Sequence, residues 1–558
     1  MNARRVAVFL TALGLLAGCL ISAPKLLHPF RMFADFQDAI SRLYALAQTR
    51  DLTFEETLDP HARGLVTEAR RADRYFRIAP YDAYTEQIVT EGALPNLPAR
   101  DAAAVLHVIG PHAEPAAWER PHTRLERWGR MLLALACWIG VTAFIAELAL
   151  PLRVLAGALI TGWGLWVLSF LTGLPLAALY PLWIPVSLAG ACYLLFARFR
   201  ARVSARVSWR ALGALALFLA FFPEIWSPFF FADLHGPDAR TMWFYRYKFE
   251  FLHGFRPDLI REHMADWSQR DYPWFLGGAV GIASWKDAAS FAGWNENAAF
   301  GSLFWIVLAT LSLWTRLFSR RSMLLAVVVL ILAYGACGGY VTNGYMDGLW
   351  IPLFGFFLYG YFSRPGGAVF SQGELWLALA VAASLKYEAL ACFAVFALVE
   401  AIRRLRVSRD VFARFVFGEL PFWGSAFAPV LLGKFTLRAY GISDQYAGGA
   451  RLLSISAYDA LKRFESAHRF IFKRVFFENP RYAVPLVLLL VLGSVHRKFG
   501  DAGRILGGIY LLSLPAIVVY TLTPYDQTWH LETSAFRVLM IYPFFGALAL
   551  AFCKSSDV

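Results

Sequence analysis

The sequence predicts an all-α polytopic membrane protein with about 12 to 14 transmembrane helices and a small soluble outer segment after the first helix. Of its 558 residues, 58% are hydrophobic and only 17% are charged. A soluble protein carries about 25% charged residues. Apolar runs of roughly 18 or more residues recur along the chain, as membrane-spanning helices require. Strand-like alternation is nearly absent, which disfavours a β-barrel.

The net charge of +13 does not indicate a nucleic-acid partner. Many Arg residues lie in short loops between apolar runs, where they set the orientation of membrane helices. All six cysteines fall in apolar runs, and no CxxC pair occurs. This distribution argues against a disulfide framework and against a zinc site.

The basic loops predict the topology. Arg4 and Arg5 place the N-terminus in the cytoplasm, so a first helix in residues 1–23 delivers residues 24–128 to the outer side. Residues 129–210 hold further transmembrane helices, and 211–558 form the membrane core. The short basic loops that follow, such as RFRARVSARVSWR, then lie on the cytoplasmic side.

Four polar stretches fall on the outer side in this topology. They are residues 232–298, the turn TNGYMDG, the turn LKYEA and the stretch TPYDQTWHLETSAFR. Because they emerge from one membrane bundle on one side, we expect them to build one shared site. A long basic stretch at 434–481, predicted to be an outer loop, favours a phosphate-bearing ligand near that face. Solvated helix faces explain its charges equally well.

The segment after the fifth helix offers two acids. Asp238 follows Pro237 and is either the N-cap of a helix or a carboxylate held at the membrane surface. Asp233 is its rival, and sequence physics does not separate them. Asp271 and Tyr272 join a polar loop to an apolar run, where Tyr272 also suits an interfacial aromatic belt.

The later polar turns contribute ionisable residues between apolar runs. Asp347 lies either at membrane depth, where burial of a charge is costly, or in water at a loop tip. Lys386 and Glu388 are two residues apart and do not face each other on one helix. If the chain breaks here into two half-helices, both side chains can turn into a cavity. Alternatively, their two charges simply neutralise each other. Near the C-terminus, Asp526, His530, Thr533 or Ser534, and Arg537 recur at helical spacing on one stripe.

These motifs in this order resemble the bacterial membrane glycosyltransferases of the GT-C fold. The motifs are an Asp-Ala before an aromatic-basic helix, Asp-Tyr-Pro, Gly-Tyr-x-Asp, Lys-x-Glu and the terminal Thr-Pro-x-Asp-x-x-Trp-His-x-x-Thr-Ser-x-x-Arg. The resemblance is to a branch similar to protein mannosyltransferases and lipid A aminoarabinose transferases. It covers roughly residues 210–553, and Ala389 stands where the family usually has Gly after Lys-x-Glu.

The resemblance implies a hexosyl- or pentosyltransferase of the cell envelope, in the bacterial inner (cytoplasmic) membrane with its active site facing outward. Such enzymes move a sugar from a polyprenyl-phosphate donor to a lipid, glycan or protein hydroxyl, with inversion. Asp238 is then the base. Substrate or donor-phosphate binding falls to a set of seven residues: Asp271, Tyr272, Asp347, Lys386, Glu388, His530 and Arg537.

Arg and Lys side chains can neutralise a departing phosphate, so the chemistry needs no metal. A diphosphate donor would favour a divalent ion, for which Asp238, Asp271 and Asp347 are the candidate ligands. Two alternatives stay open: a transporter or flippase, and an O-antigen ligase or polymerase that uses a lipid-diphosphate donor. A transporter predicts internal repeats, which the sequence lacks.

Overall fold

The computed structural model describes a large part of the chain from residue 124 onward. The described ranges are 124–145, 148–200, 243–263, 272–287, 296–318, 346–362, 370–442, 456–479 and 527–535, with single positions or short pieces at 226, 229–230, 483, 513–514, 516–518, 520–521 and 539. The predicted first helix and all but the end of the predicted outer segment 24–128 lie outside them.

Every regular element of these ranges is helical, which confirms the all-α prediction for this part of the chain. In chain order the helices are α6 (Arg124–Val141), α7 (Leu150–Thr172), α8 (Leu176–Arg200), α11 (Tyr245–His253), α12 (Pro257–His263), α13 (Leu276–Val280), the 3-10 turn η4 (Gly281–Asp287), α14 (Glu296–Phe318), α16 (Asp347–Phe362), α17 (Gln372–Leu385), α18 (Glu388–Leu405), α19 (Arg409–Arg414), the π-helix η7 (Phe415–Glu419), α20 (Leu420–Gly424), the 3-10 turn η8 (Ser425–Phe427), α21 (Ala428–Ala439), α23 (Ala457–Phe470), the π-helix η9 (Ile471–Phe477), α26 (Gln527–His530) and the π-helix η10 (Leu531–Ala535).

Three helical segments of the described residues are long and apolar enough to cross a membrane: Leu150–Thr172, Leu176–Ala197 and Arg409–Ala439. The apolar runs of the sequence predict spans at 154–173, 176–197 and 415–433, and each of these three segments overlaps one of them. The outer face of α8 is itself apolar, with the side chains of Leu182 and Val186 largely exposed. Contiguous exposed apolar surface of this kind suits contact with lipid tails.

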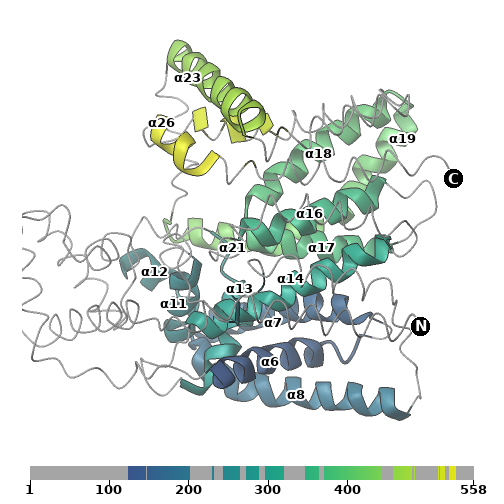
Figure 1. Ribbon diagram of the computed structural model, residues 1–558, viewed down its shortest axis with the longest axis vertical. Helices are drawn as coiled ribbons and strands as arrows, with labels where there is room; N and C mark the ends of the chain where they lie inside the picture. Colours follow the sequence, from purple (N-terminus) through teal and green to yellow (C-terminus); the bar gives the residue numbers. More distant parts are fainter. Residues whose placement is uncertain are drawn as a thin grey trace, which may run out of the picture.

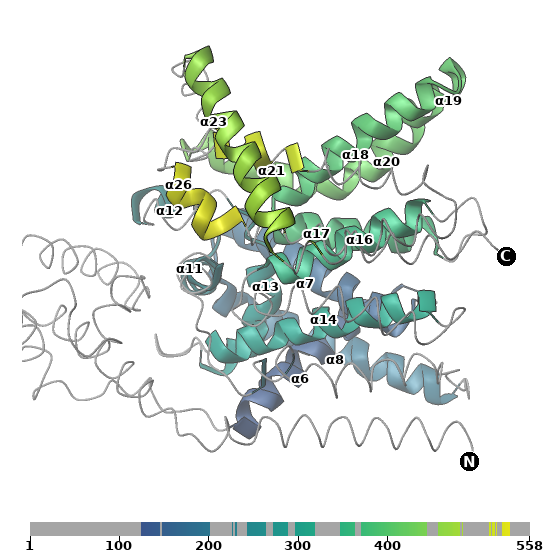
Figure 2. The same cartoon turned by 45° about the horizontal axis from the view of Figure 1, so that its top comes forward.

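The helices form one bundle with two distinct ends (Figures 1 and 2). Helices α6, α7 and α8 pack together, and α14, α16 and α17 run alongside them. Both views place α11, α12 and α26 at one end of the bundle and α19 at the opposite end. We call the end that carries α11 and α12 the site end.

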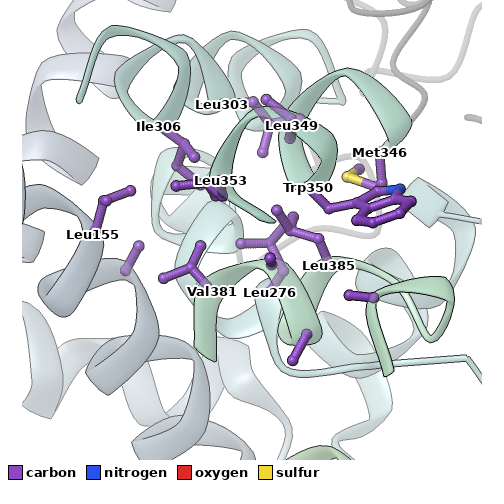
Figure 3. Close-up of a cluster of buried hydrophobic side chains, with 14 of the residues drawn as sticks. Leu155, Leu276, Leu303, Ile306, Met346, Leu349, Trp350, Leu353, Val381 and Leu385 are labelled. Atoms are coloured by element: carbon purple, nitrogen blue, oxygen red, sulfur yellow. The ribbon is translucent and has the colours of Figure 1, made fainter. Parts of the chain in front are cut away.

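Aliphatic side chains from five segments form the core beneath the site end. Figure 3 shows side chains of α7, α13, α14, α16 and α17 packed together, among them Leu155, Leu276, Leu303, Ile306, Leu349, Leu353, Val381 and Leu385. Most are fully buried. Because burial of each such side chain stabilises by about 1.5 to 3 kcal/mol, this cluster holds α16 and α17 side by side.

Helices α6 and α7 approach so closely that only glycine fits at residue 157. A Cβ atom built there would overlap the backbone carbonyl of Trp138, whose indole N–H donates to Ala279 O at 3.2 Å.

We expect Gly157→Ala to destabilise the fold by about 1 to 3 kcal/mol, as overpacking does. Denaturation by SDS in mixed micelles measures this. Gly129→Ala on α6 is the control, because its added methyl meets nothing within 4 Å. It should be neutral or stabilise by up to about 1 kcal/mol, and equal unfolding of the two variants would contradict the packing argument.

Element boundaries differ from the sequence prediction in three places. Helix α6 begins at Arg124, before the predicted boundary at 129, because the buried Arg127 guanidinium donates to Phe229 O at 2.7 Å and ties the helix start to the bundle. The apolar run of the sequence predicts a helix over 349–362, and helix α16 begins two residues earlier, at Asp347. The stretch 434–481 is not one loop: α21 continues to Ala439, and α23 with η9 occupies residues 457–477.

Candidate functional site

The break between α17 and α18 creates a charged cluster at the site end. Lys386 ends α17 with an extended backbone, φ −158° and ψ 142°, and α18 begins at Glu388. The Lys386 ammonium lies 2.7 Å from Asp347 Oδ1 and 2.7 Å from Glu388 Oε1. Because the chain is not helical at Lys386, side chains two residues apart face each other here, which a continuous helix would forbid. We call these three residues the carboxylate–lysine cluster.

Asp347 is buried at the start of α16. Its side chain is only 3% exposed, so the interpretation that it lies in water at a loop tip is wrong. The Trp350 indole N–H donates to Asp347 Oδ1 at 3.2 Å. The first turn of a helix also favours a carboxylate, because its free N–H groups carry partial positive charge. A helix start, an indole and a lysine thus compensate the buried charge.

Glu388 retains an acceptor that the protein does not use. Its Oε1 accepts from Lys386 and, at 3.4 Å, from the Tyr272 hydroxyl. Its Oε2 is shielded from solvent and has no hydrogen-bond partner in the structure. An unmade hydrogen bond at a buried carboxylate costs about 1 to 3 kcal/mol or more. The Glu388 side chain is also the most exposed of the cluster, at 27%. A ligand hydroxyl or amine could supply the missing donor.

Aromatic rings and two further cations surround Tyr272. Its ring lies 5.2 Å from the Trp243 ring and 5.6 Å from that of Tyr387. The Arg246 guanidinium lies 4.6 Å from the centre of the Trp243 ring, and the Lys434 ammonium lies 4.4 Å from that of Tyr387. Cations over aromatic faces at these distances are attractive contacts. The cluster therefore has an aromatic side that carries two positive charges.

The resemblance implies that Lys386 binds substrate or the donor phosphate, but the charges of the cluster argue against direct phosphate binding by Lys386. With its two carboxylates the cluster carries a formal charge of −1. Its ammonium already donates to both carboxylates and is almost fully buried. The cluster thus repels an anion and attracts a hydroxyl or a cation. On the aromatic side, Lys434 is only partly buried and is better placed to balance a phosphate, whereas Arg246 is fully buried.

A second acid lies nearby on α11. Glu250 is fully buried, and neither carboxylate oxygen has a hydrogen-bond partner in the structure. Its Oε2 lies against Gly277 of α13, where any larger residue would collide with it. Desolvation by burial raises the pKa of the Glu250 carboxyl well above its usual range, so the protonated form is favoured.

A buried ionic network at the other end of α18 provides a contrast. Glu400 accepts from Arg403, Arg404 and the Tyr361 hydroxyl at 2.7 to 3.0 Å. Arg404 also donates to Glu419 at 2.6 and 2.9 Å. Both oxygens of Glu400 are satisfied, so this network joins α16, α18 and η7 without offering an acceptor to a ligand. A closed network suits a structural role.

Of the predicted site residues, the structure brings together Tyr272, Asp347, Lys386 and Glu388. Asp238, its rival Asp233, Asp271 and Arg537 lie outside the described residues. His530 ends α26, and only its backbone is described. The predicted polar stripe assumed α-helical spacing. Leu531–Ala535 is instead π-helical, with its hydrogen bonds five residues apart.

A metal site is not apparent in the part of the chain that the structure describes, where no three His, Cys, Asp or Glu residues group suitably for an ion. Asp347, one of the three predicted ligands, is paired with Lys386 instead. Asp238 and Asp271 lie outside this part, so the metal alternative remains a prediction.

The sequence analysis did not single out Trp243, Arg246, Glu250, Tyr387 or Lys434 for this site. One signal was available for α11: Arg246 and Glu250 stand four residues apart in the otherwise aromatic stretch FYRYKFEFLHG, so they share a helix face. For Lys434 the only signal in the sequence was that it lies in a basic stretch. Its proximity to Tyr387 depends on how α21 packs.

No family model matches the chain, and no curated protein or solved structure is detectably similar to it.

Proposed function

We propose that the protein is a membrane glycosyltransferase that moves a sugar from a polyprenyl-phosphate donor to an acceptor hydroxyl, in the inner membrane with its site facing outward. The observation that supports this is the carboxylate–lysine cluster, with an unused carboxylate oxygen on Glu388 beside the rings of Tyr272 and Tyr387. Carboxylates accept hydrogen bonds from sugar hydroxyls, and aromatic side chains cover the apolar faces of sugar rings. Both kinds of group are therefore suited to binding a sugar. The order of the sequence motifs supports the same function.

In the proposed reaction, the acceptor oxygen forms a bond to the anomeric carbon of the donor sugar. The bond between that carbon and the phosphate oxygen breaks, and the phosphate leaves with the electron pair. A carboxylate base, Asp238 by the resemblance, takes the hydroxyl proton. Glu388 accepts from a ligand hydroxyl, and Asp347 and Lys386 fix its position. Lys434, with His530 and Arg537 from the C-terminal stretch, balances the phosphate.

A direct test uses the purified protein in proteoliposomes with polyprenyl-phosphate donors that carry radiolabelled hexoses or pentoses, and a bacterial lipid and glycan extract as acceptor. We expect label to move to the acceptor fraction while free polyprenyl phosphate accumulates. A transporter would move the donor across the bilayer without cleaving it. A ligase or polymerase would consume only lipid-diphosphate donors. Failure of every monophosphate donor would overturn the proposal.

The base has its own test. We expect Asp238→Asn to reduce transfer by about 10²- to 10⁴-fold, the usual contribution of a general base, with normal insertion into the membrane. Asp258→Asn is the matched control, because Asp258 forms only a half-exposed ion pair with Arg256, at 2.6 Å, and should leave transfer unchanged. Full transfer by Asp238→Asn would show that another group, with Asp233 the first alternative, is the base.

A further inference from the structure

Helix α23 and the π-helix η9 form one helical segment, residues 457–477, that the proposed site does not use. Its inward face is apolar, and Ala467, Ile471 and Val475 recur at four-residue spacing and are fully buried. This stripe anchors the segment to the rest of the protein. The opposite face is exposed.

The segment is attached where an apolar run ends. The Arg463 guanidinium donates to Thr521 O at 3.3 Å, and the Gln527 side-chain amide donates to Arg463 O at 2.6 Å. Thr521 lies at the end of the apolar run 505–522, which the sequence predicts to cross the membrane. In Figures 1 and 2, α23 runs across the direction of α14, α16 and α17. The segment therefore lies across the bundle at the level where a predicted transmembrane run ends.

The exposed face combines aromatic and basic side chains. Tyr458 and Phe477 stand near its two ends and are 75% and 76% exposed. Between them, on the same face, the structure exposes Lys462, Arg469 and Lys473. Large apolar side chains in water are unfavourable, whereas rings at both ends and cations between them suit the boundary between lipid tails and headgroups.

The acids on and beside this segment offset its cations only in part. Asp459 is engaged at the helix start, where its carboxylate accepts from the Ser456 hydroxyl at 2.6 Å. Glu478 lies 3.9 Å from Lys473 and 4.0 Å from Arg474, and all three side chains are more than half exposed. Solvated pairs at that distance are weak. Glu465 is the remaining exposed acid on this segment, and it lies between Lys462 and Arg469 on the same face, which therefore carries three cations and one acid.

We propose that the exposed face of residues 457–477 docks on the anionic outer leaflet of the membrane. Tyr458 and Phe477 enter the headgroup region, and Lys462, Arg469 and Lys473 bind lipid phosphates. The inference rests on the membrane placement in the proposed function but not on glycosyl transfer. A site fed by a lipid-linked donor gains from a fixed depth in the bilayer, and this helix provides it.

The test is hydrogen–deuterium exchange on the full-length protein in nanodiscs of phosphatidylcholine, alone or mixed equally with phosphatidylglycerol. Each basic side chain near an anionic surface contributes on the order of a fivefold preference. We therefore expect amide exchange in residues 457–477 to slow by roughly 10- to 100-fold in the anionic discs. High salt should remove much of this protection.

The variant Lys462→Gln, Arg469→Gln, Lys473→Gln should lose the protection. Arg409→Gln with Arg414→Gln, on exposed α19 at the opposite end, should keep it. Equal exchange in the two lipids, or protection that survives in the triple variant, would overturn the proposal. Protection that appears only with added soluble protein would do so too, because the face would then dock a protein. Inactivity in the transfer assay leaves this result unaffected, so the two proposals fail separately.

Discussion

Lys386→Met should destabilise the protein by about 3 to 5 kcal/mol, the usual cost of breaking a buried ion pair by removing one partner. Methionine keeps the length of the side chain but removes the charge. The Asp347 and Glu388 carboxylates then share a site with no cation between them, although each lay 2.7 Å from the ammonium. At least one of them has to take up a proton or turn away. Unfolding by SDS in mixed micelles measures the loss.

The second variant in this experiment is the double change Asp347→Asn with Lys386→Met. It removes the most buried carboxylate together with the ammonium, so we expect it to recover about half or more of the stability lost in the single variant. Lys473→Met is the control, because the Lys473 side chain is 66% exposed and its replacement should change stability by less than about 0.5 kcal/mol. A Lys386→Met protein as stable as this control would show that the pair contributes little.

Glu388→Gln should have the opposite effect: it should reduce sugar transfer but leave the stability of the fold nearly unchanged. Lys386 retains Asp347, so a neutral pair remains where the cluster carried −1, and stability should change by less than about 1.5 kcal/mol. The amide keeps the shape but weakens the contact with a ligand hydroxyl. Because a hydrogen bond to a charged group contributes about 1.5 to 3 kcal/mol, we expect kcat/KM for sugar transfer to fall by about 10- to 100-fold.

Two companion variants make this result specific. Tyr272→Phe removes a long hydrogen bond of 3.4 Å to Glu388 and should reduce kcat/KM by less than about tenfold. Glu374→Gln alters a partly buried carboxylate in the capping box of α17 and should leave transfer unchanged. If Glu388→Gln retained full kcat/KM with every donor that the wild type uses, Glu388 would not contact the ligand.

The difference between the two ionic networks of α18 follows from their environments. At its C-terminal end, three arginine and tyrosine side chains saturate Glu400. At its N-terminal end, one lysine serves two carboxylates, and Glu388 Oε2 has no partner. Natural proteins leave few buried polar atoms unpaired, and a bound ligand, water or ion is one explanation for those that persist. This contrast, more than burial itself, is why we propose a ligand-binding role for the first network.

The long apolar helices could be predicted from the sequence, because the length of an apolar run and the residues that end a helix are local properties of the chain. All three long apolar helices fall close to their predicted ranges. The break at LKYEA was also predictable, since a Lys and a Glu two residues apart inside an apolar stretch are hard to bury on one continuous helix. The predicted stripe on residues 526–537 was less secure. It assumed α-helical spacing throughout, and a π-helix at Leu531–Ala535 changes the spacing.

The sequence by itself determined that the part of the chain that the structure describes is helical and apolar, and that Tyr272, Asp347, Lys386 and Glu388 lie at the ends of apolar segments. Only the tertiary structure decided their partners. Asp347 and Lys386 are 39 residues apart, and Tyr272 and Glu388 are 116 apart. Such pairings depend on how whole helices pack, which no local pattern encodes. Packing also pairs Lys386 with two carboxylates and leaves Glu388 Oε2 without a hydrogen-bond partner.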